Sequence, residues 1–316
     1  MCKCLCCYRP LAAGERDFHA SCARRFFGLT TPPVLEYTRD NLDDLASQII
    51  AQQTTLTGVQ PKLSLYMQQT EGLQRLTIVG LWGEYILKPQ SDTYPELPEV
   101  EDLTMHLAQL CKIDIVPHTL IRMADGSLCY LTRRIDRTKD GKKIAMEDLC
   151  QLTNRLTEHK YKCSYEVVGE TIQRYSSVPK MDAVNFLDIL LFCYLTGNND
   201  MHLKNFSLYQ PQKGEVRLTP AYDLINAAIV YPNKDELALK LNNKRQDIGR
   251  DDFYALAQTL HIEPKTVDNL IQKYRKCLPQ VQQLIESSFV SKALQIRYLQ
   301  LYQTRLQTLG VNQKTT

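Results

Sequence analysis

The chain has 316 residues, of which 44% are hydrophobic and 23% are charged, so its composition is that of a globular protein with room for two packed domains. A formal net charge of +3, without a basic block interleaved with aromatic residues, predicts no direct contact with nucleic acid. No apolar run reaches the roughly 18 residues of a membrane span, and no leader stands at Met1, so we expect a cytoplasmic protein with no membrane contact.

The first segment, residues 1–30, is rich in cysteine. Four of its soft side chains stand in two pairs, spaced C-x-x-C and H-x-x-C: Cys4, Cys7, His19 and Cys22. Such ligands could converge on a tetrahedral zinc ion. Cys2 and Cys6 offer alternative pairings, and the segment could instead dock its phenylalanines on the main body. We therefore treat a zinc knuckle, which could also mediate a protein contact, as a hypothesis.

Next, residues 42–50 have the pattern of an amphipathic helix, and apolar residues alternate from Leu63 onward, which predicts a strand. The connection between them contains Thr55, Thr57 and Gly58. With one glycine and no complete phosphate-loop pattern, this loop alone would not identify a nucleotide site.

A short apolar strand around residues 82–89 ends in Lys88. In a kinase-like lobe this lysine would neutralise phosphates of ATP, but it could also be an edge-strand lysine that faces water. The helix predicted at about 96–111 begins with several acids. Glu101 could pair with Lys88, or it could only stabilise the start of its own helix.

Two further strands are predicted at 118–123 and 128–134, joined by a turn with Asp125 and Gly126. Helical patterns dominate from residue 145 to the C-terminus. The predicted fold class is α+β, with a small β-rich lobe over residues 31–134 and a large helical lobe over 135–316. This layout is typical of a two-lobed protein-kinase-like fold.

The chemistry concentrates in Gly197–Phe206, directly after an apolar run that predicts a buried helix. Asp200 is followed five positions later by Asn205, and a second acid, Asp223, follows after a turn. Protein kinases place a hydroxyl-accepting carboxylate and a metal-binding amide at this spacing, with the other metal ligand further on. The alternative is a capped surface turn, which Asn-Asn-Asp also favours.

Five blocks of this sequence occur in the order of a known family: Gly58–Lys62, Ile86–Pro89, Glu147–Gln151, Gly197–Phe206 and Thr219–Asp223. In these blocks the chain resembles the HipA-type serine/threonine kinases of bacterial toxin-antitoxin systems, from about residue 50 to the C-terminal helices. It is most similar to the short form, HipT. In HipT systems a separate small protein, HipS, supplies the N-terminal subdomain of full-length HipA, and HipB supplies the DNA-binding part.

The resemblance implies roles for individual residues and the use of ATP and magnesium. Asp200 matches the catalytic base, while Asn205 and Asp223 match the magnesium ligands. His202 and Lys204 would order the same loop and contact the γ-phosphate.

Further nucleotide contacts are implied in the loop that covers the phosphates, on the lysine strand, at the adenine hinge and beside the second acid. They are Thr57, Gly58, Val59, Gln60, Lys62, Lys88, Arg133, Arg134, Ile135 and Tyr222. The family also autophosphorylates a serine in the covering loop. Here the matching positions are Thr55 and Thr57, so the resemblance implies a phosphothreonine.

The resemblance also implies partners. Members of the family phosphorylate aminoacyl-tRNA synthetases, and the short form targets the tryptophanyl enzyme, with antitoxins resembling HipS and HipB. Two other functions fit the residues. One is a pseudokinase-like regulatory module, and the other is a small-molecule or phosphoinositide kinase, because the D-x-H-x-x-N arrangement also resembles phosphoinositide-kinase loops. The absence of a basic amphipathic helix weighs against a lipid substrate.

Overall fold

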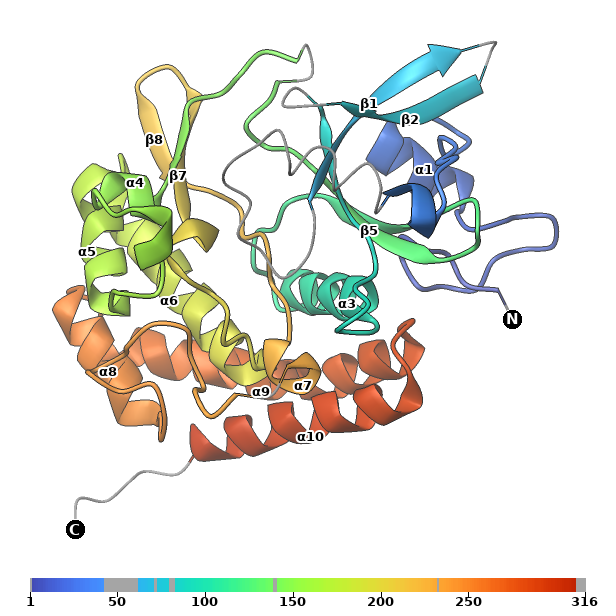
Figure 1. The fold of residues 1–316 in the computed structure, drawn as a ribbon. Helices are drawn as coiled ribbons and strands as arrows, with labels where there is room; N and C mark the ends of the chain where they lie inside the picture. Colours follow the sequence, from blue (N-terminus) through green and yellow to red (C-terminus); the bar gives the residue numbers. More distant parts are fainter. Residues whose placement is uncertain are drawn as a thin grey trace. The chain divides into compact units, whose positions relative to one another are not determined.

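The computed structural model describes residues 2–42, 62–70, 73–79, 83–138, 141–231 and 233–310. The chain divides into two compact units (Figure 1). Unit 1 comprises Met1–Leu103, Val116–Gly141 and Ser287–Val290. Unit 2 comprises Thr104–Ile115, Lys142–Glu286 and Ser291–Thr316. The helix predicted at 42–50 and the loop with Thr55, Thr57, Gly58, Val59 and Gln60 lie outside the described residues.

Unit 1 contains an antiparallel sheet in the order β2-β1-β3-β5-β4. Its elements are α1 (Ala20–Phe27), β1 (Leu63–Thr70), β2 (Leu73–Val79), β3 (Tyr85–Lys88), β4 (His118–Arg122) and β5 (Leu128–Arg133). Helix α3 (Leu97–Leu110) begins in this unit. The strand predicted from Leu63 and the strand that ends in Lys88 are therefore confirmed.

Alternation and turn chemistry explain these strands. In β1 the side chains of Leu63 and Leu65 are buried while Tyr66 is exposed, as expected for a strand with one face on a core. The predicted hairpin connects β4 to β5. Its Gly126 has φ +88°, and the Asp125 carboxylate accepts a hydrogen bond from the backbone N–H of Ser127 at 2.9 Å.

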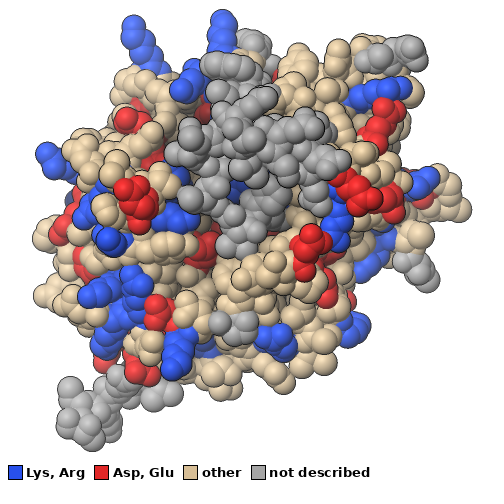
Figure 2. Space-filling model, in the orientation of Figure 1, with Lys and Arg blue, Asp and Glu red and all other residues tan. Residues whose placement is uncertain are grey.

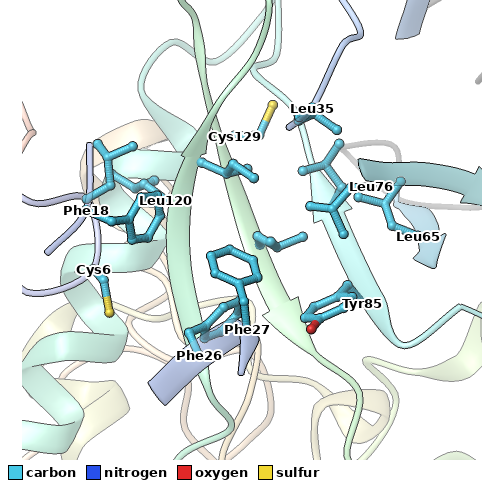
Figure 3. Packing of buried hydrophobic residues seen from close by; sticks show 14 of the residues in the cluster. Cys6, Phe18, Phe26, Phe27, Leu35, Leu65, Leu76, Tyr85, Leu120 and Cys129 are labelled. Carbon is cyan, nitrogen blue, oxygen red and sulfur yellow. The ribbon is translucent and has the colours of Figure 1, made fainter. Parts of the chain in front are cut away.

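Helix α1 packs against this sheet through aromatic side chains (Figure 3). The rings of Phe26 and Phe27 lie 6.0 and 6.2 Å from that of Tyr85 on β3. Phe18, from the segment before α1, lies beside Leu120 of β4 in the same view. The N-terminal segment therefore contributes to the core of unit 1.

Unit 2 is mostly helical. Its helices are α4 (Leu149–Leu152), α5 (Tyr165–Tyr175), α6 (Pro179–Thr196), α7 (Ala227–Val230), α8 (Arg250–Thr259), α9 (Pro264–Ser287) and α10 (Lys292–Thr308). Short 3₁₀ turns lie at η1 (Thr157–His159) and η2 (Leu203–Asn205). A small antiparallel sheet joins β6 (Met146–Asp148), β7 (Ser207–Gln212) and β8 (Glu215–Leu218).

The apolar run before Gly197 forms α6, which confirms the predicted buried helix. It contacts α5, α8 and α10, and its residues from Ile189 to Thr196 are all buried. A helix that is apolar on all sides has to be enclosed by its neighbours, and here it is. The loop that follows therefore begins at the buried C-terminal end of this helix.

The C-terminal part of the region predicted as helical from residue 145 contains α8, α9 and α10 (Figure 1). Among the helices that the structure describes, none combines the length and apolar character needed to cross a bilayer. On the face shown in Figure 2, acidic and basic side chains are interspersed.

Candidate active site

The candidate catalytic loop begins where α6 ends. Gly197 has φ +74°, and a Cβ there would lie 2.5 Å from Leu301 and 2.6 Å from Asn226, so glycine is required on both counts. The next residue, Asn198, is fully buried, and its side-chain oxygen accepts the backbone N–H of Asp200 at 3.2 Å. The turn thus fixes the backbone that carries Asp200.

Asp200 is partly exposed, and its carboxylate accepts a hydrogen bond from the Tyr161 hydroxyl. Burial and the negative charge of Asp200 raise the pKa of Tyr161, so the phenol keeps its proton at neutral pH. The Tyr161 ring also meets the ring of His202 edge-on at 5.0 Å, and the His202 backbone N–H donates to the Asp200 carbonyl at 2.8 Å. Tyr161 therefore holds the carboxylate of Asp200, and His202 bonds to its backbone.

Asn205 is buried and donates its amide N–H to the backbone carbonyl of Asp200 at 3.1 Å. Because the NH₂ group is used in this way, the Asn205 side-chain oxygen is the atom left to face a cation. Lys204 points elsewhere, with its ammonium 2.8 Å from a carboxylate oxygen of Asp148. The structure therefore brings Asp200, His202 and Asn205 together and places the Lys204 ammonium at Asp148.

The β7–β8 hairpin returns the chain to this loop. The Tyr222 hydroxyl lies 2.6 Å from the Ser207 hydroxyl and 3.1 Å from the Lys204 carbonyl, so Tyr222 reaches the residues on either side of Asn205. Asp223 follows directly and has φ +54°, a left-handed conformation that few residues other than glycine adopt. Aspartate tolerates this conformation better than most residues with a side chain.

In unit 1, Lys88 and Glu101 form an ion pair of 2.5 Å. Lys88 is 5% exposed and Glu101 is 2% exposed. Strand β3 lies between β1 and β5, so the alternative of an edge-strand lysine facing water is wrong. Protein kinases join a β3 lysine to a glutamate on the following helix in the same way.

The predicted adenine hinge consists of Arg133, the last residue of β5, and the next two residues, Arg134 and Ile135. The Arg133 guanidinium donates to the Phe26 carbonyl of α1 at 2.9 Å, so this side chain has a structural contact. Arg134 forms two hydrogen bonds with Asp136, of 2.8 and 2.7 Å. Burial acts to raise the pKa of Asp136, but the bonds and charges of Arg134 and Arg137 outweigh it and lower this pKa.

Ile135 is partly buried beside these arginines, and Lys62 is exposed at the start of β1. No contact described for either residue tests its predicted role at the nucleotide.

The structure brings all four predicted zinc ligands of unit 1 together. The ligand atoms of Cys4, Cys7, His19 and Cys22 all lie within 4.8 Å of one another. Burial acts to raise the pKa of the Cys4 thiol, but hydrogen bonds from backbone N–H groups outweigh it and lower this pKa. Neither Cys2 nor Cys6 belongs to this group: Cys2 is exposed, and the Cys6 sulfur lies 3.6 Å from the Arg25 guanidinium.

Sequence reasoning missed two partners of the loop, Tyr161 and Ser207, and left Asp148 without a role. Tyr161 is 39 positions from Asp200, and Asp148 is 56 positions from Lys204. Local patterns carry no signal for such contacts. Asp148 was singled out only as a member of the Glu147–Gln151 block, which resembles a block of the family.

Comparison with known proteins shows which family this chain matches. A family model described as the HipA-like C-terminal domain matches residues 54–282, which is more than half of the chain. "Putative kinase Y4dM" of Sinorhizobium fredii is 31% identical over 229 residues, covering 67% of this chain and 55% of that protein. A "Putative kinase" of Haemophilus influenzae is 26% identical over 312 residues and covers 88% of both chains.

The "Serine/threonine-protein kinase toxin HipA" of Shewanella oneidensis is 24% identical over 209 residues, which cover 60% of this chain and 47% of the toxin. The chain thus spans about half the length of Y4dM and of this toxin.

Two solved structures share the fold. In the Shewanella oneidensis complex of HipA, HipB and operator DNA, the matching chain has a TM-score of 0.65 at 20% identity, covering 80% of this chain and 63% of that one. The Helicobacter pylori proinflammatory kinase CtkA gives a TM-score of 0.50 at 12% identity, covering 78% and 93%. The predicted α+β, kinase-like fold class is confirmed.

Proposed function

Because this chain belongs to the family of HipA-like C-terminal domains, we propose that it is a cytoplasmic serine/threonine protein kinase that uses ATP and Mg²⁺. The observation that carries the proposal is the loop after α6. It joins the Asn205 amide to the Asp200 backbone by a hydrogen bond, and Tyr222, the residue before Asp223, donates to the Lys204 carbonyl of the same loop. Acid, amide and second acid occur in the order that phosphoryl transfer requires.

In this proposal Asp200 orients the acceptor hydroxyl of the protein substrate and takes its proton. The hydrogen bond from the Tyr161 hydroxyl to one carboxylate oxygen of Asp200 would orient this carboxylate toward the acceptor. The partial exposure of Asp200 supports this role, because a protein side chain has to reach it.

The donor set suits magnesium, which prefers carboxylate and amide oxygens. The Asn205 amide is oriented by the Asp200 carbonyl, and Asp223 directly follows Tyr222, whose hydroxyl donates to the Lys204 carbonyl. When bound, the ion would neutralise charge on the ATP phosphates. Lys88, oriented by Glu101 in unit 1, would supply a second positive charge to the same phosphates.

We further propose that the chain acts as a toxin of the HipT type, with a protein resembling HipS and a HipB-like antitoxin as partners. The target we propose is an aminoacyl-tRNA synthetase, first of all the tryptophanyl enzyme. The resemblance of the five sequence blocks supports this proposal. The toxin HipA of Shewanella oneidensis, which is found in complex with HipB and DNA, supports it as a relative.

Autophosphorylation at Thr55 or Thr57 is proposed as the means of regulation. A phosphate on either residue would add about two negative charges beside the phosphates of ATP. The repulsion between these charges would expel the loop from the nucleotide.

The proposal is tested with γ-labelled ATP, purified chain and a cell lysate, then with purified tryptophanyl-tRNA synthetase. We expect label on a serine or threonine of a protein, dependent on Mg²⁺ and absent with Asp200→Asn. ATP binding without transfer would favour the pseudokinase-like module. Transfer to a metabolite or phosphoinositide alone would favour the small-molecule kinase, and either result would contradict the proposal.

A further inference from the structure

The cluster of thiols and imidazole in unit 1 has the dimensions of a metal site. The Cys7 sulfur lies 3.5 Å and the Cys22 sulfur 3.9 Å from Nδ1 of His19. A tetrahedral zinc ion, with bonds of about 2.3 Å to sulfur and about 2.0 Å to nitrogen, separates its ligand atoms by roughly 3.5–3.8 Å. These two sulfur–nitrogen distances are close to those that a shared ion would set, and all four ligand atoms lie within 4.8 Å of one another.

The backbone around the first two thiols forms a tight knuckle. The Tyr8 N–H donates to the Cys4 carbonyl and the Cys4 N–H to the Arg9 carbonyl, each at 2.9 Å. Tyr8 has φ +62°, which is uncommon for a residue with a side chain. Its hydroxyl donates to the Asp102 carboxylate at 2.6 Å and so anchors the knuckle to α3. This turn directs Cys4 and Cys7 toward one point.

His19 is oriented as metal-binding histidines are. Its Nε2 lies 3.0 Å from the Pro10 carbonyl, which can only accept a hydrogen bond, so the ring proton belongs on Nε2. Nδ1 then carries a lone pair and faces the sulfurs of Cys7 and Cys22. A backbone carbonyl that fixes the tautomer and the ring in this way is the usual outer partner of a histidine ligand.

The segment that carries these ligands is joined to the sheet of unit 1. The Leu5 carbonyl lies 3.4 Å from the Leu120 nitrogen, and the Phe26 carbonyl accepts from Arg133 at 2.9 Å. Helix α1, with 8 residues, is shorter than the roughly 12–15 residues at which isolated helices become even marginally stable. It therefore needs other interactions to keep its shape.

We propose that Cys4, Cys7, His19 and Cys22 bind one structural Zn²⁺ ion, which holds the N-terminal knuckle and α1 against strands β4 and β5. Three thiolates and Nδ1 complete a four-coordinate site, and a closed set of this kind serves structure and not catalysis. This inference concerns the stability of unit 1 and is independent of the proposed kinase activity.

The test measures metal and thermal stability in the full chain. Purified under reducing conditions, the chain should contain one equivalent of zinc by plasma mass spectrometry. Replacement with Co²⁺ should give the thiolate charge-transfer and intense visible bands of a tetrahedral site. Cys4→Ser and Cys22→Ser should lose both signals, while Cys2→Ser, the matched control at an exposed thiol, should keep them.

A chelator that removes the ion should lower the melting temperature of the original chain and of Cys2→Ser by the same amount. Because Cys4→Ser could fail to fold, the chelator experiment on the original chain decides the matter without it. Less than a tenth of an equivalent of zinc, together with no tetrahedral cobalt spectrum on reconstitution, would overturn the inference. Asp200→Asn should retain its zinc, so failure of the kinase proposal would leave this result unaffected.

Discussion

Two lysine–carboxylate pairs, one chosen from each unit, differ in their access to water. In unit 1 the side chains of Lys88 and Glu101 are 6% and 3% exposed. In unit 2 the side chains of Lys204 and Asp148 are 37% and 16% exposed. A buried pair is stable only while both charges are present, whereas a solvated pair contributes little and exchanges partners easily. We infer that Lys88 is a fixed cation and that Lys204 is free to move to a substrate phosphate.

The largest effect is expected from breaking the buried pair. Lys88→Met removes the ammonium that pairs with the buried Glu101 carboxylate, so the free energy of unfolding should fall by about 3–5 kcal/mol. Denaturant titration measures this loss. Adding Glu101→Leu should recover most of the stability but no phosphoryl transfer. Recovery of transfer in the double variant would show that Lys88 has no role at the phosphates.

The opposite outcome is expected for Asp200 in unit 2, whose loss should reduce the proposed activity strongly and the stability only slightly. Asp200→Asn should reduce the rate of phosphoryl transfer by about 10²–10⁴-fold, because proton acceptance is lost. Its melting temperature should stay close to that of the original chain, since the side chain is partly exposed. Asp251→Asn, at an exposed acid in α8, is the matched control. A rate within a factor of two of the original would remove Asp200 from its proposed role.

The turn beneath that acid should be intolerant of change. Gly197→Ala combines backbone strain of about 1–3 kcal/mol with contacts that are too close to Leu301 and Asn226. Gly214→Ala is the matched control, because Gly214 also has a positive φ but no atom within 4 Å of a new Cβ. Thermal unfolding should therefore show a clearly larger loss for Gly197→Ala. Equal losses would mean that the loop is not held as described.

The smallest stability effect should follow loss of the solvated pair. Lys204→Met should change the free energy of unfolding by about 1 kcal/mol or less, because Asp148 keeps its hydrogen bond from the Gln151 N–H. The rate of transfer should nevertheless fall more than in Lys213→Met, an exposed lysine of the β7–β8 hairpin. A stability loss as large as that of Lys88→Met would remove the contrast between the two pairs.

Much of this arrangement could be predicted from sequence because its signals are local. The apolar run of α6, the glycine at its end and the alternation from Leu63 each reflect a single element. The four proposed zinc ligands could be named from sequence because they form two pairs with recognisable spacing. Sequence alone could not exclude Cys2 and Cys6, since the knuckle geometry that separates them depends on contacts with Asp102 and Arg25.

The missed features depend on contacts between distant segments. Tyr161 lies in no pattern that points to the candidate catalytic loop, and the family block that contains Asp148 does not indicate its contact with Lys204. The structural role of the Arg133 side chain depends on α1, 107 positions earlier. The sequence also did not determine whether Lys88 is buried. The position of a strand within its sheet follows from its pairing with other strands and not from its own residues.

Calorimetric titration with ATP tests the central claim most directly. In magnesium buffer the chain should take up one ATP, and Asp223→Asn should bind it at least tenfold more weakly and lose the dependence on Mg²⁺. Absence of ATP uptake by the original chain, or unchanged magnesium-dependent binding by Asp223→Asn, would contradict the account.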